Sequence, residues 1–468
     1  MKIITHLVFV FFSSLIFGQG NLNIDLVAHV PNDQALSDIW GFVGTDSSEY
    51  AIIGTRTTTE IYHLSDPSNP LLVGSVPGVS SVWRDIKSLD NYIYVVADQG
   101  SDGITIIDMS EAPGIITARN VFPMVNGTPV EKCHNLYIDT SSQVMFLAGC
   151  NGNRGIIAFD IREDPLNPAL INIVSEEYSH DVFVRDSLAF SSEIFIGAFT
   201  IYNIKDLMNP VELGSATTST FFTHNAWSST DNQYLYTTDE KPNGTIDAYD
   251  ISDPQNPIRV DIFTPDAILN QGIIPHNTHW MNDFLITSWY DYGIVISDVS
   301  NPEKIVEVGH YDTGESPDCW GAYPFLPSGT VLATDIGNGL FVLEPEYVRA
   351  CWLEGNVKAA ATGEFIEGVE VEILNAQLNE GSTDFNGEYA TGLATAGTYD
   401  VRVRDANNCE ATLSLPVNEL PEIIAESAQT EDYTCNQLAE ITVGGVTPTT
   451  GGSGSYQYSL NGGSWTAA

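Results

Sequence analysis

The sequence predicts an all-β protein: a seven-bladed β-propeller closed by its N-terminal strand and followed by β-sandwich modules. A turn phrase rich in Asp, Asn and Pro recurs between apolar strands, for example DPLNP at 164–168 and DPQNP at 253–257. Asp and Asn cap such turns with their side chains, and Pro fixes the backbone angle φ. The residues just before the phrase follow one another at intervals of 45, 52, 43, 47 and 48 positions: His63, Asp108, Asp160, Asn203, Asp250 and Asp298. This interval is that of a four-stranded propeller blade.

Seven repeats are counted from the first strand of each blade. These strands begin near Asp38, Asp85, Asn135, Asp181, Asn225, Asn277 and Asp318. The seventh repeat lacks an outer strand, whereas residues 22–30 resemble the outer strands of the other repeats. Pairing this N-terminal strand with the last blade would close the ring and cover its edges, so we expect a propeller over 21–346. The unit at 85–122 has a degenerate turn phrase, and misreading it would give six or eight blades.

The chain begins with the features of a secretory signal peptide. Met1 and Lys2 precede a mostly apolar run over 3–17, and small residues follow at 18–20. The run is shorter than the roughly 20 residues that cross a membrane. We therefore expect a signal peptide over 1–20, no membrane span, and a protein that is secreted or held at the cell surface. Disulfides persist in that compartment.

The net charge of the chain excludes nucleic acid as a partner. Lys and Arg total 17 and Asp and Glu total 61, which gives a net charge of −44. Too few basic residues are present to displace the counterions of a nucleic acid. Surface carboxylates keep an exported protein soluble and can hold hard cations. We expect a monomer whose partner is an extracellular protein or a glycan.

Several motifs carry a family resemblance. SDIWG at 37–41, WRDIK at 83–87 and the HN pairs at 224–225 and 276–277, together with the turn phrases, resemble the choice-of-anchor B family of LVIVD-repeat propellers. The resemblance implies a propeller fold and a secreted or surface-exposed bacterial protein, and it implies no established chemistry.

The rest of the chain is modular. Residues 351–416 resemble a carboxypeptidase-regulatory-like β-sandwich, and 420–468 resemble the start of a gliding-motility-adhesin-type repeat. The sequence stops at Ala468 within that repeat and shows no anchoring signal, so we expect a fragment.

Polar residues recur where the first strand of each blade begins, and this strand lines the channel of a propeller. The candidate ligand-binding residues are His134, His180, His224, His276, Asp38, Asp85, Asp181 and Asp318. The structural alternative is that each Asp or Asn caps the backbone of the neighbouring blade. Repetition in every blade favours this alternative for the acids and amides, whereas the histidines are less regular.

Carboxylates on the same predicted face suggest a metal ion. The loops between second and third strands carry the candidate metal ligands Asp98, Asp102, Asp239, Glu240 and Asp335. Oxygen ligands suit Ca²⁺, so Ca²⁺ is the candidate cofactor, although the sequence makes no cofactor certain. Zinc is less favoured, because the histidines come from different blades and no HxH or HExxH spacing is present. The alternative for the acidic loops is an ordinary hairpin turn.

The cysteines suggest disulfides. Cys133 and Cys150 lie symmetrically about a hairpin turn centred at position 141.5, so we predict that they face each other and form a bridge. Cys351 and Cys409 flank the predicted sandwich and are the second candidate pair. Cys319 takes the place of Ile39 in the repeat, as a buried thiol. Cys435 would have lost its partner to truncation.

These observations support a non-enzymatic secreted or cell-surface platform for binding or adhesion, with its ligand on the His/Asp-rich face. The alternative is an extracellular metal-dependent hydrolase or lyase that acts on polysaccharide. No GxSxG motif supports nucleophilic catalysis. Six tryptophans near strand starts or loops could stack on sugars, although packing between blades is their more common role: Trp40, Trp83, Trp227, Trp280, Trp289 and Trp320.

Overall fold

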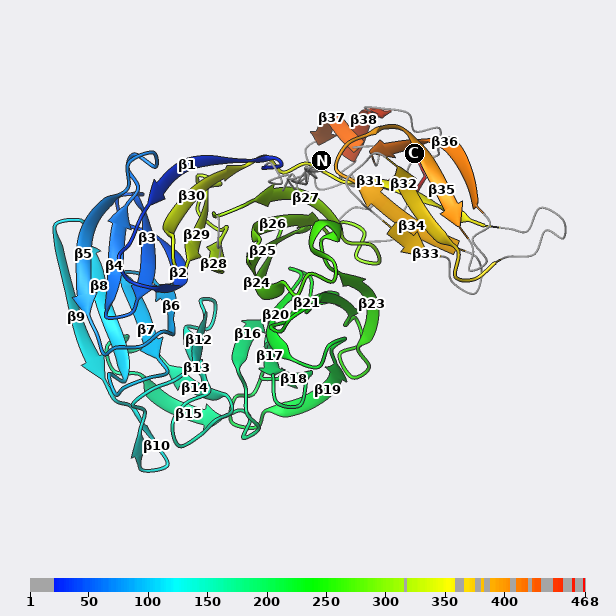
Figure 1. Ribbon diagram of the computed structural model, residues 1–468. Coiled ribbons are helices and arrows are strands. Elements are labelled where there is room, and N and C mark those ends of the chain that lie inside the picture. Colours follow the sequence, from blue (N-terminus) through cyan, green and yellow to red (C-terminus); the bar gives the residue numbers. More distant parts are fainter. Residues whose placement is uncertain are drawn as a thin grey trace, which may run out of the picture.

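The computed structural model describes residues 21–314 and 318–357. Beyond these it describes 366–374, 380–382, 388–404, 410–419, 423–430, 441–448, 457–458 and 466–467. Seven four-stranded antiparallel sheets surround a central axis (Figure 1). The prediction of an all-β protein with a seven-bladed propeller is therefore confirmed. The predicted signal peptide at 1–20 lies outside the described residues.

Each of the first six blades runs in chain order from an inner to an outer strand. The first three blades comprise β2 (Leu36–Val43), β3 (Glu49–Thr55), β4 (Thr58–His63) and β5 (Leu71–Pro77); β6 (Arg84–Leu89), β7 (Tyr92–Ala97), β8 (Ile104–Glu111) and β9 (Ile115–Val121); and β12 (Asn135–Asp139), β13 (Val144–Ala148), β14 (Ile157–Asp160) and β15 (Ala169–Ile173). The unit with the degenerate turn phrase is thus a complete blade. A short hairpin, β10 (Met124–Val125) and β11 (Thr128–Pro129), follows it.

The next three blades repeat the pattern. They comprise β16 (Asp181–Arg185), β17 (Leu188–Glu193), β18 (Ala198–Asn203) and β19 (Val211–Thr217); β20 (Thr223–Ser228), β21 (Tyr234–Asp239), β22 (Ile246–Asp250) and β23 (Ile258–Phe263); and β24 (Ile274–Met281), β25 (Phe284–Tyr290), β26 (Gly293–Asp298) and β27 (Val306–Tyr311). A single 3-10 turn, Asp266–Ile268, precedes β24.

The N-terminal strand completes the seventh blade, as predicted. This blade has the order β1-β30-β29-β28, with β1 (Ile24–Val30), β28 (Cys319–Tyr323), β29 (Val331–Asp335) and β30 (Gly339–Pro345). Strand β1 pairs antiparallel with β30, from Ile24 opposite Pro345 to Val30 opposite Leu340. The two ends of the propeller segment are therefore joined by backbone hydrogen bonds, which leaves no open blade edge at the ring closure.

The turn phrases act through Asp side chains. The carboxylates of Asp66, Asp164, Asp206 and Asp253 each accept a hydrogen bond from the backbone N–H two residues later, at 3.0–3.1 Å. These contacts hold the turn between the third and fourth strands of the first, third, fourth and fifth blades, which explains why the phrase recurs.

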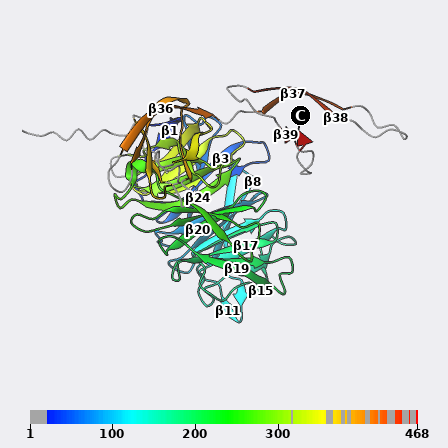
Figure 2. The same ribbon diagram turned by 90° about the vertical axis from the view of Figure 1, so that its right-hand side faces the viewer.

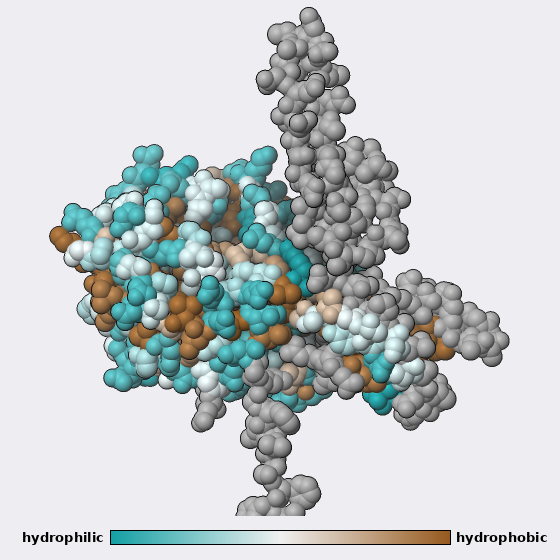
Figure 3. Space-filling model, turned by 90° about the horizontal axis from the view of Figure 1, so that it is seen from above, coloured by the Kyte–Doolittle hydropathy of each residue, from teal (hydrophilic) through white to brown (hydrophobic). Residues whose placement is uncertain are grey.

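The apolar core lies between the blades. Inner and middle strands are mostly buried; Tyr50, Ile52 and Ile53 of β3 are fully buried. Outer strands are half exposed, and Leu71 of β5 is 59% exposed. Figure 3 shows one edge of the molecule, where hydrophobic residues are scattered among hydrophilic ones.

A six-stranded sheet follows the propeller (Figures 1 and 2). Its order is β33-β32-β35-β36-β31-β34, and its strands are β31 (Cys351–Asn356), β32 (Glu370–Leu374), β33 (Glu380–Ser382), β34 (Glu388–Leu393), β35 (Gly397–Arg404) and β36 (Glu410–Glu419). The junction is anchored on the sixth blade, because Ala350 N–H donates to Asp298 Oδ2 at 2.8 Å. Two hairpins follow: β37 (Ile423–Thr430) with β38 (Ile441–Pro448), and β39 (Gln457–Tyr458) with β40 (Thr466–Ala467).

The Cys133–Cys150 disulfide is confirmed. Both cysteines lie two residues beyond the pair Asn135 and Ala148, which face each other in the hairpin of β12 and β13. Cys319 is a fully buried free thiol, as expected, but its place in the repeat was wrong. It precedes the bulge of its inner strand as Leu36 does, and so corresponds to Leu36 rather than Ile39. Cys409 and Cys435 lie outside the described residues, so the Cys351–Cys409 pair stays a prediction.

Candidate functional site

The inner strands line a narrow central cavity with side chains in successive layers. Alternate residues of a strand point to the same side, so each strand gives the channel residues at i and i+2. In β20 these are Asn225 and Trp227, and His224 stands above them at the start of the strand. The cavity volume is about 50 Å³. This space suits a metal ion or a few water molecules and is too small for a sugar ring.

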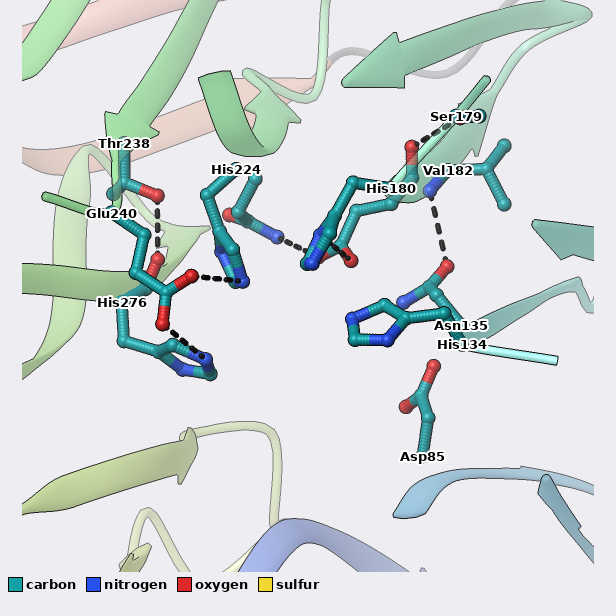
Figure 4. Close-up of polar contacts among 12 residues, drawn as sticks. Asp85, His134, Asn135, Ser179, His180, Val182, His224, Thr238, Glu240 and His276 are labelled. Atoms are coloured by element: carbon teal, nitrogen blue, oxygen red, sulfur yellow. Dashed lines mark hydrogen bonds and ion pairs between the residues drawn. The ribbon is translucent and has the colours of Figure 1, made fainter. Parts of the chain in front are cut away.

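Four histidines from consecutive blades form an arc at one end of this cavity. We call His134, His180, His224 and His276 the histidine arc (Figure 4). Neighbouring ring centroids are 3.9, 4.3 and 4.4 Å apart along the arc. The side chains lie about 45 residues apart in sequence, and the equivalent position of each inner strand brings them together. The sequence identified all four residues, but their mutual contact depends on the closed ring.

Burial keeps part of the arc uncharged. His180, His224 and His276 are only 6%, 3% and 2% exposed. Burial, together with the neighbouring imidazoles of His134 and His224, lowers the pKa of His180 to about 3. Burial, followed by the charge of His224, also holds the pKa of His276 well below its ordinary value. A neutral imidazole has a free nitrogen lone pair, which is the form that binds metal ions.

His134 differs from its neighbours. Burial by itself would lower its pKa, but a hydrogen bond with Asp98 and the charge of Asp181 raise it above the ordinary value. The contact joins His134 Nδ1 to Asp98 Oδ2 at 3.4 Å. His134 is therefore the arc histidine whose pKa is raised by nearby carboxylates, those of Asp98 and Asp181.

Carboxylates complete two groups of metal-ligating atoms. Among the described residues, His134, His180 and Asp181 form one group, and His180, His224 and Glu240 form the other, with the ligand atoms of each group within 4.8 Å of one another. Glu240 lies between two imidazoles (Figure 4), with Oε2 at 3.5 Å from His224 Nε2 and Oε1 at 3.9 Å from His276 Nε2. These separations exceed a strong hydrogen bond. Ligands around a tetrahedral zinc ion stand about 3.3–3.6 Å apart.

His224 and Asp181 each have an atom suited to binding a cation. The Nδ1 atom of His224 is buried and has no hydrogen-bond partner. For Asp181, burial alone would raise the pKa of the carboxyl, but the hydrogen bond from His180 and the charge of His224 lower it far below its ordinary value. Asp181 is therefore a carboxylate at neutral pH, able to bind a cation.

The Asp and Asn side chains that follow the arc position in each inner strand make the hydrogen bonds expected of structural residues: they cap the backbone of the neighbouring blade. Asp38 accepts from Ile86 N–H at 2.9 Å, Asp85 from Leu136 N–H at 2.6 Å, and Asn135 from Val182 N–H at 3.0 Å. Asn225 accepts from Thr278 N–H at 3.2 Å. Each of these side chains thus links its inner strand to that of the following blade. Asp38, Asp85 and Asp181 also line the cavity.

Asp318 does not occupy the position expected of it. Three second-strand hydroxyls at equivalent positions, those of Thr238, Ser288 and Thr334, each donate to a carbonyl of the next blade. The acceptors are His276, Trp320 and Ser37, respectively. Trp320 therefore takes the arc position in the last blade, and its ring centroid is 4.5 Å from that of His276. The position expected for Asp318 belongs to Gly321. Asp318 was misplaced because Gly321 puts no acid or amide at the true position, and Asp318 lies three residues before it.

The carboxylates proposed as calcium ligands do not converge. Asp102 accepts from the backbone of Val79, Asp239 from Thr218 and Thr220, and Asp335 from Thr313. Asp98 and Glu240 instead face the histidine arc. Only these two of the five candidate acids therefore belong to the same site.

A buried lysine was not predicted as part of the channel. Lys87 is 8% exposed and forms ion pairs with Asp85 and, at 3.4 Å, with Asp38. Burial by itself would lower the pKa of Lys87, but the charges of Asp38 and Asp85 raise it above its ordinary value. Its ammonium also lies 4.5 Å from the centre of the Trp40 ring. This cluster joins the inner strands of the first two blades, which do not contribute to the histidine arc.

The comparisons with known proteins support the propeller. The family model of the LVIVD repeat matches residues 83–115 and 289–313. The first segment spans strands β6 to β8 of the second blade, and the second spans β26 and β27 of the sixth. No curated protein matches the chain. In the described residues, no helix is long and apolar enough to cross a membrane. The chain is thus a seven-bladed β-propeller protein that carries LVIVD repeats.

Proposed function

We propose that the propeller is a non-enzymatic binding platform whose histidine arc holds one divalent transition-metal ion. One observation carries the proposal: two overlapping groups of two imidazoles and one carboxylate share His180 and have their ligand atoms within 4.8 Å. Imidazole nitrogen suits Zn²⁺ and its neighbours in the first transition row, whereas Ca²⁺ prefers oxygen. Zinc therefore replaces calcium as the favoured ion.

The ion would act as a structural clamp. Its ligands come from the third, fourth and fifth blades, so binding would fix these inner strands relative to one another. The ligand side chains are largely buried, as in closed structural zinc sites. A hydrolase or lyase is not favoured, because the cavity of about 50 Å³ cannot admit a sugar ring. A rigid face rimmed by acidic loops suits the recognition of an extracellular partner.

The platform would act as a monomer at the cell surface or in the medium. The signal-peptide features of residues 1–20 and the resemblance to the choice-of-anchor B family support secretion. Residues 351–416 and 420–468 would be spacer or adhesion modules, because they resemble a carboxypeptidase-regulatory-like sandwich and a gliding-motility-adhesin-type repeat.

Metal binding by the full chain tests the proposal. Protein stripped with a chelator is titrated with Zn²⁺ by calorimetry, and bound metal is counted after dialysis. We expect one Zn²⁺ per chain. His224→Ala and Glu240→Gln should each weaken binding, and His224→Ala should do so by about 100-fold or more, because it removes a direct ligand. Zn²⁺ at 100 times Kd should stabilise the fold by about 2.7 kcal/mol.

His29→Gln is the matched control. It removes a histidine from β1, on the outer strand of the seventh blade. This variant should bind Zn²⁺ as the unchanged protein does. Substoichiometric zinc, or an affinity that His224→Ala leaves unaltered, would refute the metal-site assignment.

A further inference from the structure

The carboxylate of Glu240 is held by a tyrosine of the next blade. Glu240 follows β21 of the fifth blade, and Tyr290 is the last residue of β25 in the sixth. The hydroxyl of Tyr290 donates a hydrogen bond to Glu240 Oε1 at 3.0 Å. Glu240 Oε2 lies 3.5 Å from His224 Nε2, and both residues belong to one of the metal-ligating groups. Oε1 is therefore engaged by a donor, whereas Oε2 is the oxygen nearer to an imidazole.

The hydroxyl of Tyr290 is fixed by the packing of its own residue. The ring centroid of Tyr290 is 5.2 Å from that of His276 and 6.1 Å from that of Trp320. The backbone of Tyr290 pairs with Ile274 of β24 and forms a β-bridge with Asp318, which precedes the inner strand of the seventh blade. The fold itself therefore brings this donor to Glu240, before any ion is bound.

His180 has a supporting contact of the same kind. His180 Nδ1 lies 3.0 Å from Asp181 Oδ1. The Asp181 carboxylate can only accept a hydrogen bond, so Nδ1 carries the proton of the neutral ring and Nε2 keeps its lone pair. Histidines that bind zinc commonly donate their second ring N–H to a carboxylate in this way. His180 and Glu240, which share one metal-ligating group, thus each have a supporting hydrogen bond.

We propose that Tyr290 is a positioning residue for the metal ion: by holding Oε1, it leaves Glu240 to bind the ion through Oε2 alone. This inference rests on the proposed metal site. A carboxylate that binds through one oxygen fills one ligand position, which suits the four positions of a tetrahedral zinc ion. Without the hydroxyl, Oε1 would be free to approach the ion as an additional ligand. Tyr290 thereby brings the sixth blade into the site, although neither metal-ligating group includes a residue of that blade.

Zinc and cobalt binding by the full chain tests this role. Co²⁺ accepts the same nitrogen and oxygen ligands as Zn²⁺, and it absorbs visible light most strongly when its ligands are tetrahedral. Tyr290→Phe removes only the hydroxyl, and we expect the affinity for Zn²⁺ to fall about 10- to 100-fold. The visible absorption of the Co²⁺-loaded variant should also weaken, because Glu240 would then bind through both oxygens. A loss of stability alone would not change this spectrum.

A double-mutant cycle shows whether Tyr290 acts through Glu240. In a chain that carries Glu240→Ala, the hydroxyl of Tyr290 has no carboxylate to hold. Tyr290→Phe should therefore cause little further loss of zinc affinity in that chain. Losses that simply add in the double variant would overturn the inference, because general damage to the fold would act with or without Glu240.

Tyr292→Phe is the matched control. It removes a hydroxyl that donates to Glu307 Oε1 at 3.4 Å in the same blade, and Tyr292 is 6% exposed. Its zinc affinity and Co²⁺ spectrum should equal those of the unchanged protein, and equal losses in both tyrosine variants would overturn the role of Tyr290. Zinc binding that His224→Ala weakens but Tyr290→Phe leaves unaltered overturns this inference alone. An unchanged protein that retains no zinc overturns the metal site, and this inference with it.

Discussion

Removing the Cys133–Cys150 disulfide gives a prediction whose size follows from the chain. The bridge joins residues 17 positions apart at the open end of the β12–β13 hairpin, and both cysteines are buried. In the chain-entropy account, a cross-link stabilises the fold by restricting the unfolded state. The relation for a loop of this length gives an entropy loss of about 10.5 cal/mol/K, which is about 3 kcal/mol at 25 °C.

The expected change in melting temperature follows from this value. A propeller of roughly 325 residues unfolds with an entropy of about 0.7 kcal/mol/K, at about 2.1 cal/mol/K per residue. The double variant Cys133→Ala/Cys150→Ala should therefore melt about 4–5 °C lower than the oxidised protein.

Denaturant titration and calorimetry under oxidising and reducing conditions provide the assay. Reductant should destabilise the propeller of the unchanged protein to the level of the double variant, and should leave the propeller transition of the double variant unaffected. Equal midpoints for oxidised and reduced protein would refute the reasoning. A loss well above 5 kcal/mol would show that packing at these positions, rather than the cross-link, dominates.

Three more predictions concern other parts of the fold. Lys87→Met leaves Asp38 and Asp85 as unpaired buried acids and should cost about 3–5 kcal/mol in urea unfolding, whereas the exposed Lys205→Met should cost little; equal stability of the two variants would contradict the ion-pair account. Burial raises the pKa of Glu307 to about 8 from 4.5, so the folded state keeps a proton that the unfolded state releases, and stability should fall as pH rises from about 4.5 to about 8. Glu307→Gln should remove part of this fall, seen in urea midpoints at pH 5 and pH 9, and an unchanged pH profile would argue against the raised pKa. A chain that starts at residue 31 lacks β1 and exposes the edge of β30, so it should aggregate and lose its cooperative melting transition; a monodisperse truncated chain with an unaltered melting temperature would contradict closure by this strand.

The fold was predictable because its signals are local and repeated. The turn phrase encodes a side-chain hydrogen bond that recurs in several blades, so its interval predicts the size of a blade, and the repeated first strands predict the number of blades. The N-terminal strand was recognisable because it carries the pattern of an outer strand and the last repeat lacked one. The Cys133–Cys150 pair followed from hairpin symmetry alone.

The site was only partly predictable, since its geometry arises from ring closure. The four histidines were found by their repeated position, but nothing in their spacing shows that neighbouring ring centroids lie 3.9–4.4 Å apart. Trp320 was missed as an arc residue because Gly321, which follows it, is neither Asp nor Asn, so Asp318 was taken as the start of that strand. Lys87 was missed because a lysine two residues after Asp85 in one strand does not reveal that Asp38 of the preceding blade also pairs with it.

The most direct test of the central claim is the coordination shell of the bound metal. X-ray absorption spectroscopy on the zinc-loaded full chain counts imidazole and oxygen ligands around the ion. The histidine arc predicts one zinc ion with at least two imidazole nitrogens and a carboxylate oxygen at about 2.0–2.2 Å, and loss of this shell in His180→Ala. A shell of oxygen atoms without imidazole scattering, or no retained zinc, would contradict the account.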